Sequence, residues 1–540
     1  MVDKIQDFTI ICEGGLDNKN TFIELSRNSP GSASTLINFE PGLYGGYRRI
    51  NGFQHLNTNH PVVDSVNAEG AILGIIIYED EIYAMRKQTS GTTYKVYKYD
   101  AGSGWIAQTL GFTLNTTSGG NTVNRIRHVI FNFGSGSILC FVDGVNKATM
   151  FDGTSWTQIS SAGTGADFAN AGGAQALDTP SWVAYFQNHL FLGADSTYKS
   201  VIAHSSPSNG NNWTSAGGAG QIVVGYTVNG IKMWRDRLYV FGRESISYVS
   251  VLSGSFITKP VTDQIGCIAP DTIVEIAGDL LFLSQDGFRP IAGTDKIDDV
   301  EFNTLSRKVQ KLVKELSSTY PDENVTAVVV KQKSQVRFFY NSPAVTTADT
   351  RGILVGIREN QGQKNWEWGE LLGIQATATC SAWLNDNEYI LHGDYDGNVF
   401  RQEIGNDFNG ANITAIYTTP FIDFQAPLIR KKMRGIFAFI EPEGAVDIQA
   451  SVKYDWKNPD VLNPTTYTME GTDVGASIYG GSSAVYGGTG IVYGGGVYPV
   501  LSSGIQGSCY SAQISFSTTG TEAPYAIQTL MYEFTPQARR

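Results

Sequence analysis

The most regular feature of the chain is a short pattern of apolar and polar positions, seen clearly in MWRDRLYVFG at residues 233–242. An apolar strand is followed by a turn of two to five polar or glycine residues and then by a strand with period-two alternation. Such alternation on both sides of a short polar turn predicts a β-hairpin. The pattern begins seven times along the chain, at Tyr78, Phe133, Phe186, Trp234, Ile276, Val330 and Leu384. The intervals between these starts are 55, 53, 48, 42, 54 and 54 residues.

A second hairpin follows the first in most of these units, often with a tryptophan after a glycine turn, as at Trp105 and Trp156. Two hairpins supply four strands, and one four-stranded sheet must stack against another to bury both of its faces. Four strands repeated at a nearly constant interval predict a β-propeller of about seven blades over residues 61–405, with six or eight blades as alternatives. A series of separate β-sandwiches would have frequent turns without the longer period.

One segment, residues 303–317, departs from the β pattern and predicts an amphipathic helix. Asn303 is placed to cap its start, and Pro321 lies beyond its end. Its apolar positions have helical spacing: Leu305, Val309, Leu312, Val313 and Leu316. A solvated outer face is the simpler explanation of the basic residues on its polar side, and contact with DNA or an acidic neighbouring subunit is the alternative. These residues are Arg307, Lys308, Lys311 and Lys314.

The regions on either side of the repeats differ from them in pattern. Residues 406–540 contain longer strand-like runs, which predict a separate β-sandwich-like domain. This domain carries a loop in which Ile-Tyr-Gly-Gly and Val-Tyr-Gly-Gly recur every seven residues from Ile478. Residues 1–60 are too polar and irregular to form a core alone, so we expect an arm that docks on another surface.

Composition supports an all-β protein and limits its chemistry. Glycine is abundant, at 60 of 540 residues, and only 17% of residues are charged. The net charge of −12 argues against a strongly basic surface that would hold nucleic acid non-specifically. The five cysteines are widely separated, which predicts buried or half-buried thiols in a reducing compartment.

The search for reactive motifs gives no candidate. The sequence lacks GxGxxG, GxxxxGK[ST], GxSxG and HExxH patterns, and its six histidines are scattered. Carboxylates such as Asp80, Asp236 and Asp279 recur at hairpin turns, where aspartate bonds its own backbone. We therefore expect neither an enzyme nor a metal or cofactor site, and no apolar run is long enough to span a membrane.

The segment NFEPGLYGGYRRINGF (residues 38–53) bears on function. Together with Gly14-Gly15, it resembles the N-terminal pattern of the tail nozzle proteins of short-tailed bacteriophages, also called tail tubular protein B or packaged-DNA stabilisation proteins. The matching positions are Asn38, Gly45, Gly46, Arg48, Arg49, Gly52 and Phe53. Residues 393–424, the basic RKKMRG at 430–435 and the Arg-Arg ending also resemble that family.

The resemblance implies a structural protein of the virion, assembled in the host cytoplasm. Six copies would form a ring below the adaptor and portal, conduct and retain the viral DNA during packaging and ejection, and anchor tail fibres or a needle. An acidic, glycine- and serine-rich chain suits such a conduit, because it holds a sliding duplex weakly. Under this hypothesis Gly45, Gly46, Arg48, Arg49, Gly52 and Phe53 dock on a neighbouring subunit; alternatively, the glycines form a turn and the arginines pair with nearby acids.

A second hypothesis is a carbohydrate-binding or glycan-cleaving β-propeller, such as an adhesin or a glycosidase. It predicts acids or aromatic residues gathered at one rim of the propeller. A WD-type scaffold is a weaker alternative, because the GH and WD dipeptides of that repeat are absent.

Overall fold

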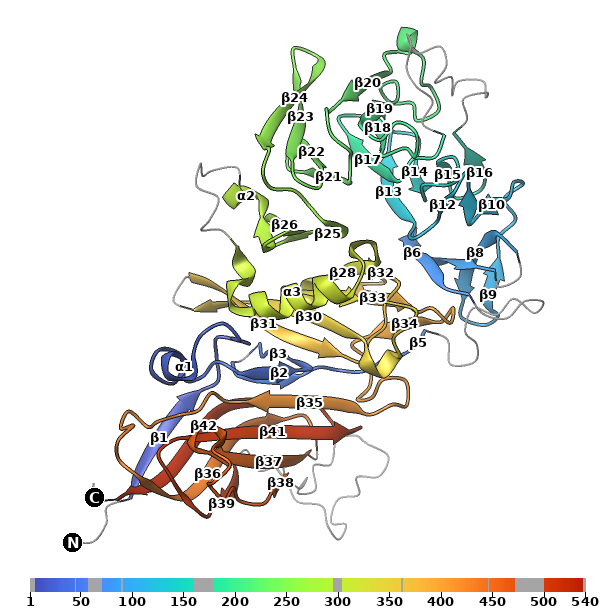
Figure 1. Cartoon of the computed structure of the whole chain (residues 1–540). Coiled ribbons are helices and arrows are strands. Elements are labelled where there is room, and N and C mark those ends of the chain that lie inside the picture. The colour runs from blue at the N-terminus through green and yellow to red at the C-terminus, as the bar shows by residue number, and fades with distance from the viewer. Residues whose placement is uncertain are drawn as a thin grey trace.

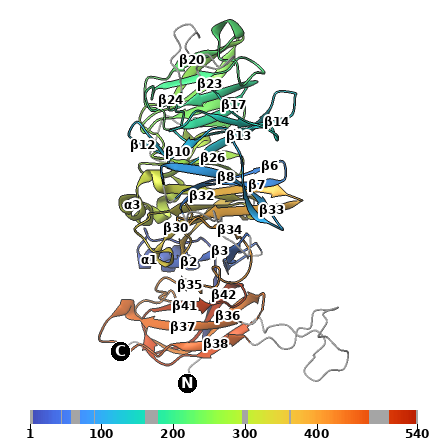
Figure 2. The ribbon, with the colours of Figure 1, turned by 90° about the vertical axis from the view of Figure 1, so that its right-hand side faces the viewer.

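The computed structural model describes residues 5–43, 45–56, 70–88, 91–159, 178–294, 304–360, 363–444, 446–471 and 500–537. The fold is mostly β, and successive sheets are arranged around a ring above a lower pair of packed sheets (Figure 1). Figure 2 shows that the helices α1 and α3 lie on the same side of the molecule.

The upper region is a β-propeller built from consecutive antiparallel sheets. The first sheet contains β6 (Ile72–Tyr78), β7 (Glu81–Lys87), β8 (Thr93–Asp100), β9 (Gly104–Ala107) and β10 (Leu114–Asn115). A small hairpin, β11 (Thr117–Ser118) and β12 (Asn121–Thr122), leads to the second sheet of β13 (Arg127–Asn132), β14 (Ser137–Val142), β15 (Thr149–Phe151) and β16 (Trp156–Gln158). The third has β17 (Trp182–Phe186), β18 (His189–Gly193), β19 (Val201–His204) and β20 (Gly220–Val223), and the fourth has β21 (Gly230–Trp234), β22 (Arg237–Phe241), β23 (Ile246–Leu252) and β24 (Ser255–Thr262).

The remaining propeller strands complete the ring. The fifth sheet contains β25 (Ala269–Ile276), β26 (Asp279–Ser284) and β27 (Gly287–Pro290). The sixth group is β28 (Val325–Val330), β29 (Gln335–Tyr340), β30 (Arg351–Asn360) and β31 (Gln363–Leu372). The last sheet combines β32 (Ala378–Leu384), β33 (Asn387–Gly393) and β34 (Val399–Gln402) with β5 (Phe53–His55), and its strand β32 lies beside β6 of the first sheet.

The predicted β-propeller is therefore confirmed. Six of its sheets contain at least four described strands. The unit that begins at Ile276 differs, because its described part is the three-stranded sheet of β25–β27. The hairpins form at the predicted positions. In the first, Glu79 and Asp80 have φ values of 48° and 59°, as a two-residue type I′ turn requires.

The predicted helix is also present, shifted by two residues. A 3₁₀ turn, η4 (Leu305–Val309), continues into α3 (Gln310–Thr319), which ends shortly before Pro321. Four of the five predicted apolar positions are buried, and Leu305 packs against the same core. Asn303 lies outside the described residues, so the predicted cap is not seen. The other helical segments are short: α1 (Phe22–Asn28), η2 (Ser215–Gly217), α2 (Ile291–Thr294), η5 (Asp322–Asn324), η6 (Lys331–Lys333), η7 (Thr347–Asp349) and η8 (Asp455–Lys457).

The lower region is a pair of β-sheets. One contains β1 (Gln6–Ile11), β3 (Phe39–Pro41), β4 (Tyr47–Arg49), β36 (Lys431–Pro442), β39 (Val500–Gly504), β40 (Ser508–Cys509) and β42 (Tyr525–Pro536). The other contains β2 (Thr35–Ile37), β35 (Ile413–Thr418), β37 (Val446–Tyr454), β38 (Tyr467–Gly471) and β41 (Ala512–Gly520). Buried side chains from both sheets share one core, among them Tyr417 and Phe516 on one side and Ile436 and Tyr532 on the other.

The two regions are continuous rather than separate. Strand β2 pairs with β35 of the lower region and, in parallel, with β31 of the propeller, so a single nine-stranded sheet runs through both. Residues 1–60 thus supply strands to the lower pair of sheets and, through β5, to the propeller. The predicted glycine- and tyrosine-rich loop lies outside the described residues.

Candidate functional site

The family-like segment, residues 38–53, forms a hairpin between the propeller and the lower sheets. Its strands β3 and β4 pair with each other, and β4 also pairs with β42. Gly46 has a φ of 73°, and a Cβ atom there would lie 2.3 Å from the carbonyl oxygen of Ile527. The hairpin therefore packs so closely on β42 that only glycine fits at this position.

Arg48 connects this hairpin to the lower sheets by charge. Its Nε and Nη2 atoms donate to the two carboxylate oxygens of Glu443 at 2.6 and 2.8 Å, a bidentate pair. Its Nη1 atom also donates to Glu40 at 2.9 Å and to Asn51 at 2.8 Å. Burial opposes the charge of Arg48, but Glu443 and Glu40 outweigh this effect and raise its pKa.

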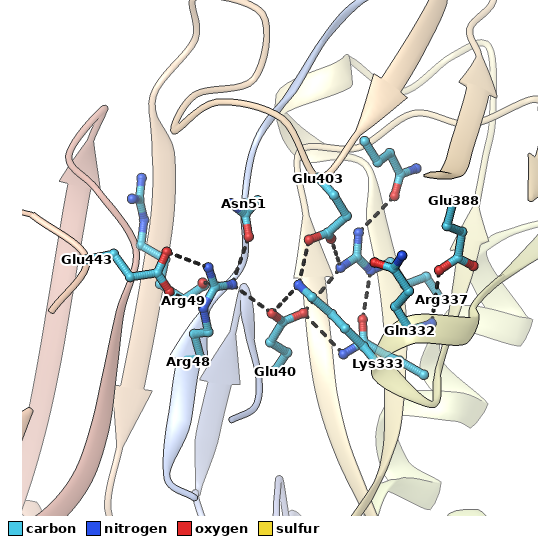
Figure 3. Close-up of polar contacts among 12 residues, drawn as sticks. Glu40, Arg48, Arg49, Asn51, Gln332, Lys333, Arg337, Glu388, Glu403 and Glu443 are labelled. Atoms are coloured by element: carbon cyan, nitrogen blue, oxygen red, sulfur yellow. Dashed lines mark hydrogen bonds and ion pairs between the residues drawn. The ribbon is translucent and has the colours of Figure 1, made fainter. Parts of the chain in front are cut away.

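Glu40 is the centre of a buried charge network, which we call the joint network (Figure 3). This side chain is 2% exposed. One carboxylate oxygen accepts from Arg48 and from Lys333 Nζ, the latter at 2.6 Å, and the other accepts from Gln335 at 3.1 Å and Arg337 at 3.2 Å. Because Arg48 is on β4 and Arg337 on β29, one carboxylate joins the N-terminal hairpin to the propeller.

Glu403, directly after β34, completes the joint network. It accepts from Lys333 Nζ at 2.5 Å and from Arg337, which also donates to Gln402 at 2.9 Å. Burial acts to raise the pKa of Glu403, but the charges of Arg337 and Lys333 outweigh it and hold this pKa at about 2. The network balances three carboxylates (Glu40, Glu403 and Glu443) against three cations (Arg48, Lys333 and Arg337).

The edge of the joint network contains a buried histidine. His392 on β33 lies 3.2 Å from Gln402 Nε2 through its Nδ1 atom, and its ring packs against Phe53 and Phe400. Burial, assisted by the charge of Arg337, lowers the pKa of His392 to about 3. The imidazole is therefore neutral in the folded protein at neutral pH.

Arg49 makes a second connection, to backbone carbonyls. It is fully buried and donates to the carbonyl oxygens of Gly520 at 2.9 Å, Asn406 at 3.1 Å and Glu522. Gly52 and Phe53 are buried too, and Phe53 lies in β5. Of the six interface candidates, Gly46, Arg49, Gly52 and Phe53 are thus internal in the isolated chain, and their contacts there are with the chain itself.

The basic residues of the predicted helix are divided between two environments. Arg307, Lys311 and Lys314 are exposed, so contact with DNA or a subunit through them stays a prediction. Lys308 instead faces inward, and its Nζ atom donates to the carbonyl oxygen of Gly14 at 3.1 Å. The opposite, apolar face of the helix packs on the core.

The sequence reasoning did not identify Glu40, Lys333, Arg337 or Glu403. One signal was available, because Arg337 interrupts the apolar run VRFFY of a buried strand. A charged side chain in a buried strand needs a partner of opposite charge, so this arginine indicates a buried ion pair. The acidic partners were not detectable in the same way, because they come from segments about 300 residues before and 66 residues after this arginine.

A second ionic cluster lies near the propeller axis. Asp271 on β25 accepts from Arg125 at 2.6 Å and from two nitrogens of Arg127 at 2.7 Å, and Arg125 also donates to carbonyls of Val325 and Thr377. Burial opposes the charge of Asp271, but the two arginines hold its pKa at about 2. The cluster borders a polar cavity of about 410 Å³ that is also lined by Trp182, Asp143 and Asp195.

Several aspartates of the propeller accept hydrogen bonds within turns. Asp143 and Asp195 each accept hydrogen bonds from two following backbone N–H groups, and Asp394 accepts from those of Asp396 and Asn398. All five cysteines are free thiols, and four of them are buried, as predicted. Among the described residues, no three His, Cys, Asp or Glu side chains are grouped as metal ligands, and no helix has the length and apolarity to cross a membrane.

Comparison with known proteins gives only low similarity to solved structures. No protein-family model and no curated protein sequence matches the chain. Among solved structures, the WD40 domain of Neurospora crassa Pan2 is 7% identical (TM-score 0.34), covering 66% of this chain and 96% of that one. BBS1N, from a complex with ARL6DN, is 10% identical (TM-score 0.35), covering 65% and 97%. The extracellular domain of BT4673 from B. thetaiotaomicron is 12% identical (TM-score 0.29), and the match spans 71% of this chain but only 39% of that protein.

Proposed function

We propose that this chain is a structural subunit of the short tail of a bacteriophage, forming a homohexameric nozzle ring that conducts and retains viral DNA. One observation carries the proposal. The residues on which the family resemblance rests, Asn38 and the segment from Gly45 to Phe53, are those that join the propeller to the lower sheets. Asn38 itself bonds the backbone of Leu372 in the propeller and Thr414 below it.

A rigid joint suits a part of a tail that must transmit force without catalysis. The joint network and the continuous nine-stranded sheet make the two regions one body. Such a unit offers its two ends to different neighbours, so the adaptor and portal side, and the fibres or needle, are its proposed partners. The net charge of −12 is compatible with DNA that passes without being held tightly.

The test is the oligomeric state of the purified chain, alone and with its adaptor partner, by mass photometry and negative-stain microscopy. The expected result is a particle of six times the chain mass with sixfold rings. Since a tail template can be required for assembly, the adaptor complex is the decisive sample. A chain that stays monomeric with the adaptor and hydrolyses glycans would overturn the proposal.

The axial cavity favours a second candidate, a carbohydrate-binding propeller. It combines an aromatic side chain, Trp182, with several polar groups, as sugar sites do. However, Arg127 covers one face of that ring at 4.3 Å, and Asp143 and Asp195 are engaged in turns. A glycan array with Trp182→Ala as the control variant separates the candidates: binding that this substitution abolishes would favour the second.

A further inference from the structure

The side of the molecule that carries α1 and α3 has many exposed basic side chains (Figure 2). Lys311 and Lys314 lie on one face of α3, opposite its buried apolar stripe. The loop before α1 packs against η4, where the N–H group of Asn18 donates to the carbonyl oxygen of Lys308 at 3.0 Å. We call the exposed cations of these elements the basic face: Lys19, Arg27, Arg307, Lys311 and Lys314.

The acids on this side are fewer, and two of them are engaged within the chain. Glu24 accepts from the N–H group and the hydroxyl of Thr21, both at 2.9 Å, and so caps α1. Glu315 pairs with Arg351 at 2.5 Å. Glu13 is exposed near the end of β1. The net charge of this side is therefore positive, although the whole chain carries −12.

The hairpin turns of the propeller lie on the side away from α3. The axial cavity brings Arg127 and Trp182, the first residues of β13 and β17, close to Asp322, which follows α3. The inner strands of the blades therefore begin near this helix and end at the opposite rim. Figure 2 agrees, because β6, β7 and β33 lie on the side opposite α3 and at a similar level.

Three neighbouring blades place acids on this opposite rim. Glu79-Asp80 forms the β6–β7 turn, and Asn385-Asp386 forms the β32–β33 turn beside it. The strands of a blade alternate in direction, so the turns after the third strand, at Asp100 and Asp152, share this rim. A Cβ atom at Gly153 would lie 3.2 Å from Glu79 Oε2, so the acids of the first two blades are adjacent. We call these residues the acidic rim: Glu79, Asp80, Glu81, Asp100, Asp152 and Asp386.

The acidic rim combines its negative charge with an exposed aromatic ring. Its bases are Lys98, which pairs with Glu81 at 3.0 Å, and Lys331, which is exposed in the next blade. Trp383, beside the β32–β33 turn, is 50% exposed. Tryptophan is among the residues most enriched at the energetic centres of protein interfaces. The basic face also has exposed apolar side chains beside it, on α1: Phe22 and Ile23.

These two surfaces fit a second copy of this chain, an inference that rests on the proposed function. They have opposite charge and lie on opposite sides of one molecule at a similar level along its length. Contacts between two different surfaces repeat head to tail and close into a ring when the rotation between subunits allows it. Duplex DNA would be attracted by the basic face alone and repelled by the acidic rim, so it accounts for only one of the two surfaces.

We propose that the basic face of one subunit docks on the acidic rim of the next, and that this contact builds the nozzle ring. Opposite charges guide the two surfaces together and set their register, while the exposed Trp383 supplies apolar contact area. Each subunit has one surface of each kind, so a closed ring leaves neither without a partner.

The experiment measures the oligomeric state of the full chain by mass photometry, in the sample in which the wild type forms rings, either the chain alone or its adaptor complex. One variant reverses the basic face with Lys311→Glu and Lys314→Glu. A second variant reverses the acidic rim with Glu79→Lys, Glu81→Lys and Asp386→Lys. Each variant alone should associate about tenfold or more weakly than the wild type, because attraction between the surfaces becomes repulsion.

An equimolar mixture of the two variants should form rings again. Each reversed surface then meets the reversed surface of the other variant, and the two variants can alternate around a ring of six. In the wild type, raising the salt from about 0.05 M to about 0.5 M should weaken association, because exposed charges are screened.

Two control variants carry the same kind of charge reversal outside the two surfaces. Asp236→Lys changes the corresponding turn of another blade, and Lys432→Glu changes an exposed position of β36. Each control should alter association less than about twofold. Thermal unfolding followed by circular dichroism checks that every variant folds. If the triple variant of the acidic rim does not fold, Glu79→Lys alone takes its place.

The outcomes separate this inference from the proposed function. Rings that persist in either reversal variant, a mixture that stays monomeric, or equal losses in the controls would overturn the docking of the basic face on the acidic rim and leave the nozzle proposal standing. If rings persist while Lys311→Glu and Lys314→Glu weaken binding of a short DNA duplex in fluorescence anisotropy, the basic face is a DNA contact instead. A wild-type chain that stays monomeric with its adaptor would refute both proposals.

Discussion

Replacing Glu403 by glutamine removes one negative charge from the joint network while keeping the shape of the side chain. Arg337, which is 1% exposed, and Lys333 would then share only Glu40 as an acidic partner. A buried cation that loses its counter-charge destabilises the folded state strongly. We therefore expect Glu403→Gln to lower the free energy of unfolding.

The size of this effect follows from the pKa. The value for Glu403 falls from 4.5, the ordinary value that the unfolded chain has, to about 2 in the folded protein. One pKa unit corresponds to about 1.4 kcal/mol, so the ionised carboxylate contributes about 3 kcal/mol at pH 7. Because the folded-state pKa is lowered, this contribution is present above pH 4.5 and is lost as the pH falls toward 2. The difference between wild type and variant should shrink to about 1 kcal/mol at pH 3.

The assay is urea unfolding followed by tryptophan fluorescence at pH 7 and pH 3. Glu443→Gln is the matched control, since Glu443 belongs to the same network but its side chain is 46% exposed. An exposed ion pair contributes about 0–1 kcal/mol, so the control should lose little at either pH. Equal losses for the two variants, or a loss for Glu403→Gln that does not depend on pH, would refute the reasoning.

Three further predictions concern other buried groups. His392 has a lowered pKa of about 3, so the unfolded state binds more protons between about pH 6.5 and 3, and stability should fall as the pH drops through that range. Urea midpoints at pH 7, 6 and 5 should fall less steeply for His392→Gln than for wild type, since the lowered pKa values of His128, His204 and His55 add to the slope in both proteins. Equal slopes for the two proteins would be the contrary outcome. Asp271→Asn leaves the buried Arg125 and the partly buried Arg127 without their carboxylate, and it should lower the free energy of unfolding by about 3–5 kcal/mol in urea unfolding. An unchanged urea midpoint would be the contrary outcome. Gly46→Ala should lower the melting temperature more than Gly45→Ala. Both positions have positive φ, and the backbone strain of alanine there costs about 1 kcal/mol, but only a Cβ atom at position 46 would meet a backbone oxygen. Equal melting temperatures for the two variants would contradict the close packing on Ile527.

The sequence was most informative where structure is local. The hairpin at Tyr78, the turn at Glu79-Asp80 and the stripe from Val309 to Leu316 depend on residues close in the chain, and their periodicity was sufficient to predict them. The unit at Ile276 has its predicted hairpin, and the described part of its sheet contains three strands. A hairpin pattern predicts two paired strands and does not indicate how many further strands join the same sheet.

The site was predictable only in part. The segment from Gly45 to Phe53 was singled out by its resemblance, but its partners in the structure were not visible, since Glu443, Ile527 and Gly520 are hundreds of residues away. We expected the N-terminal segment to dock on another surface, and in the structure its strands pair with strands of the same chain. Polar contacts between distant segments have no periodicity, so a single sequence does not reveal them.

The pairing of β5 with β34 has a consequence for how the protein is made. The first of these strands leaves the ribosome early, and its partner follows only after residue 399 has been synthesised. At about 5–20 residues per second, the N-terminal strand waits roughly 20–70 seconds for the edge that it completes. The ring therefore closes only after nearly three quarters of the polypeptide has emerged, and until then both its first and its last blades are open to pairing with other nascent chains.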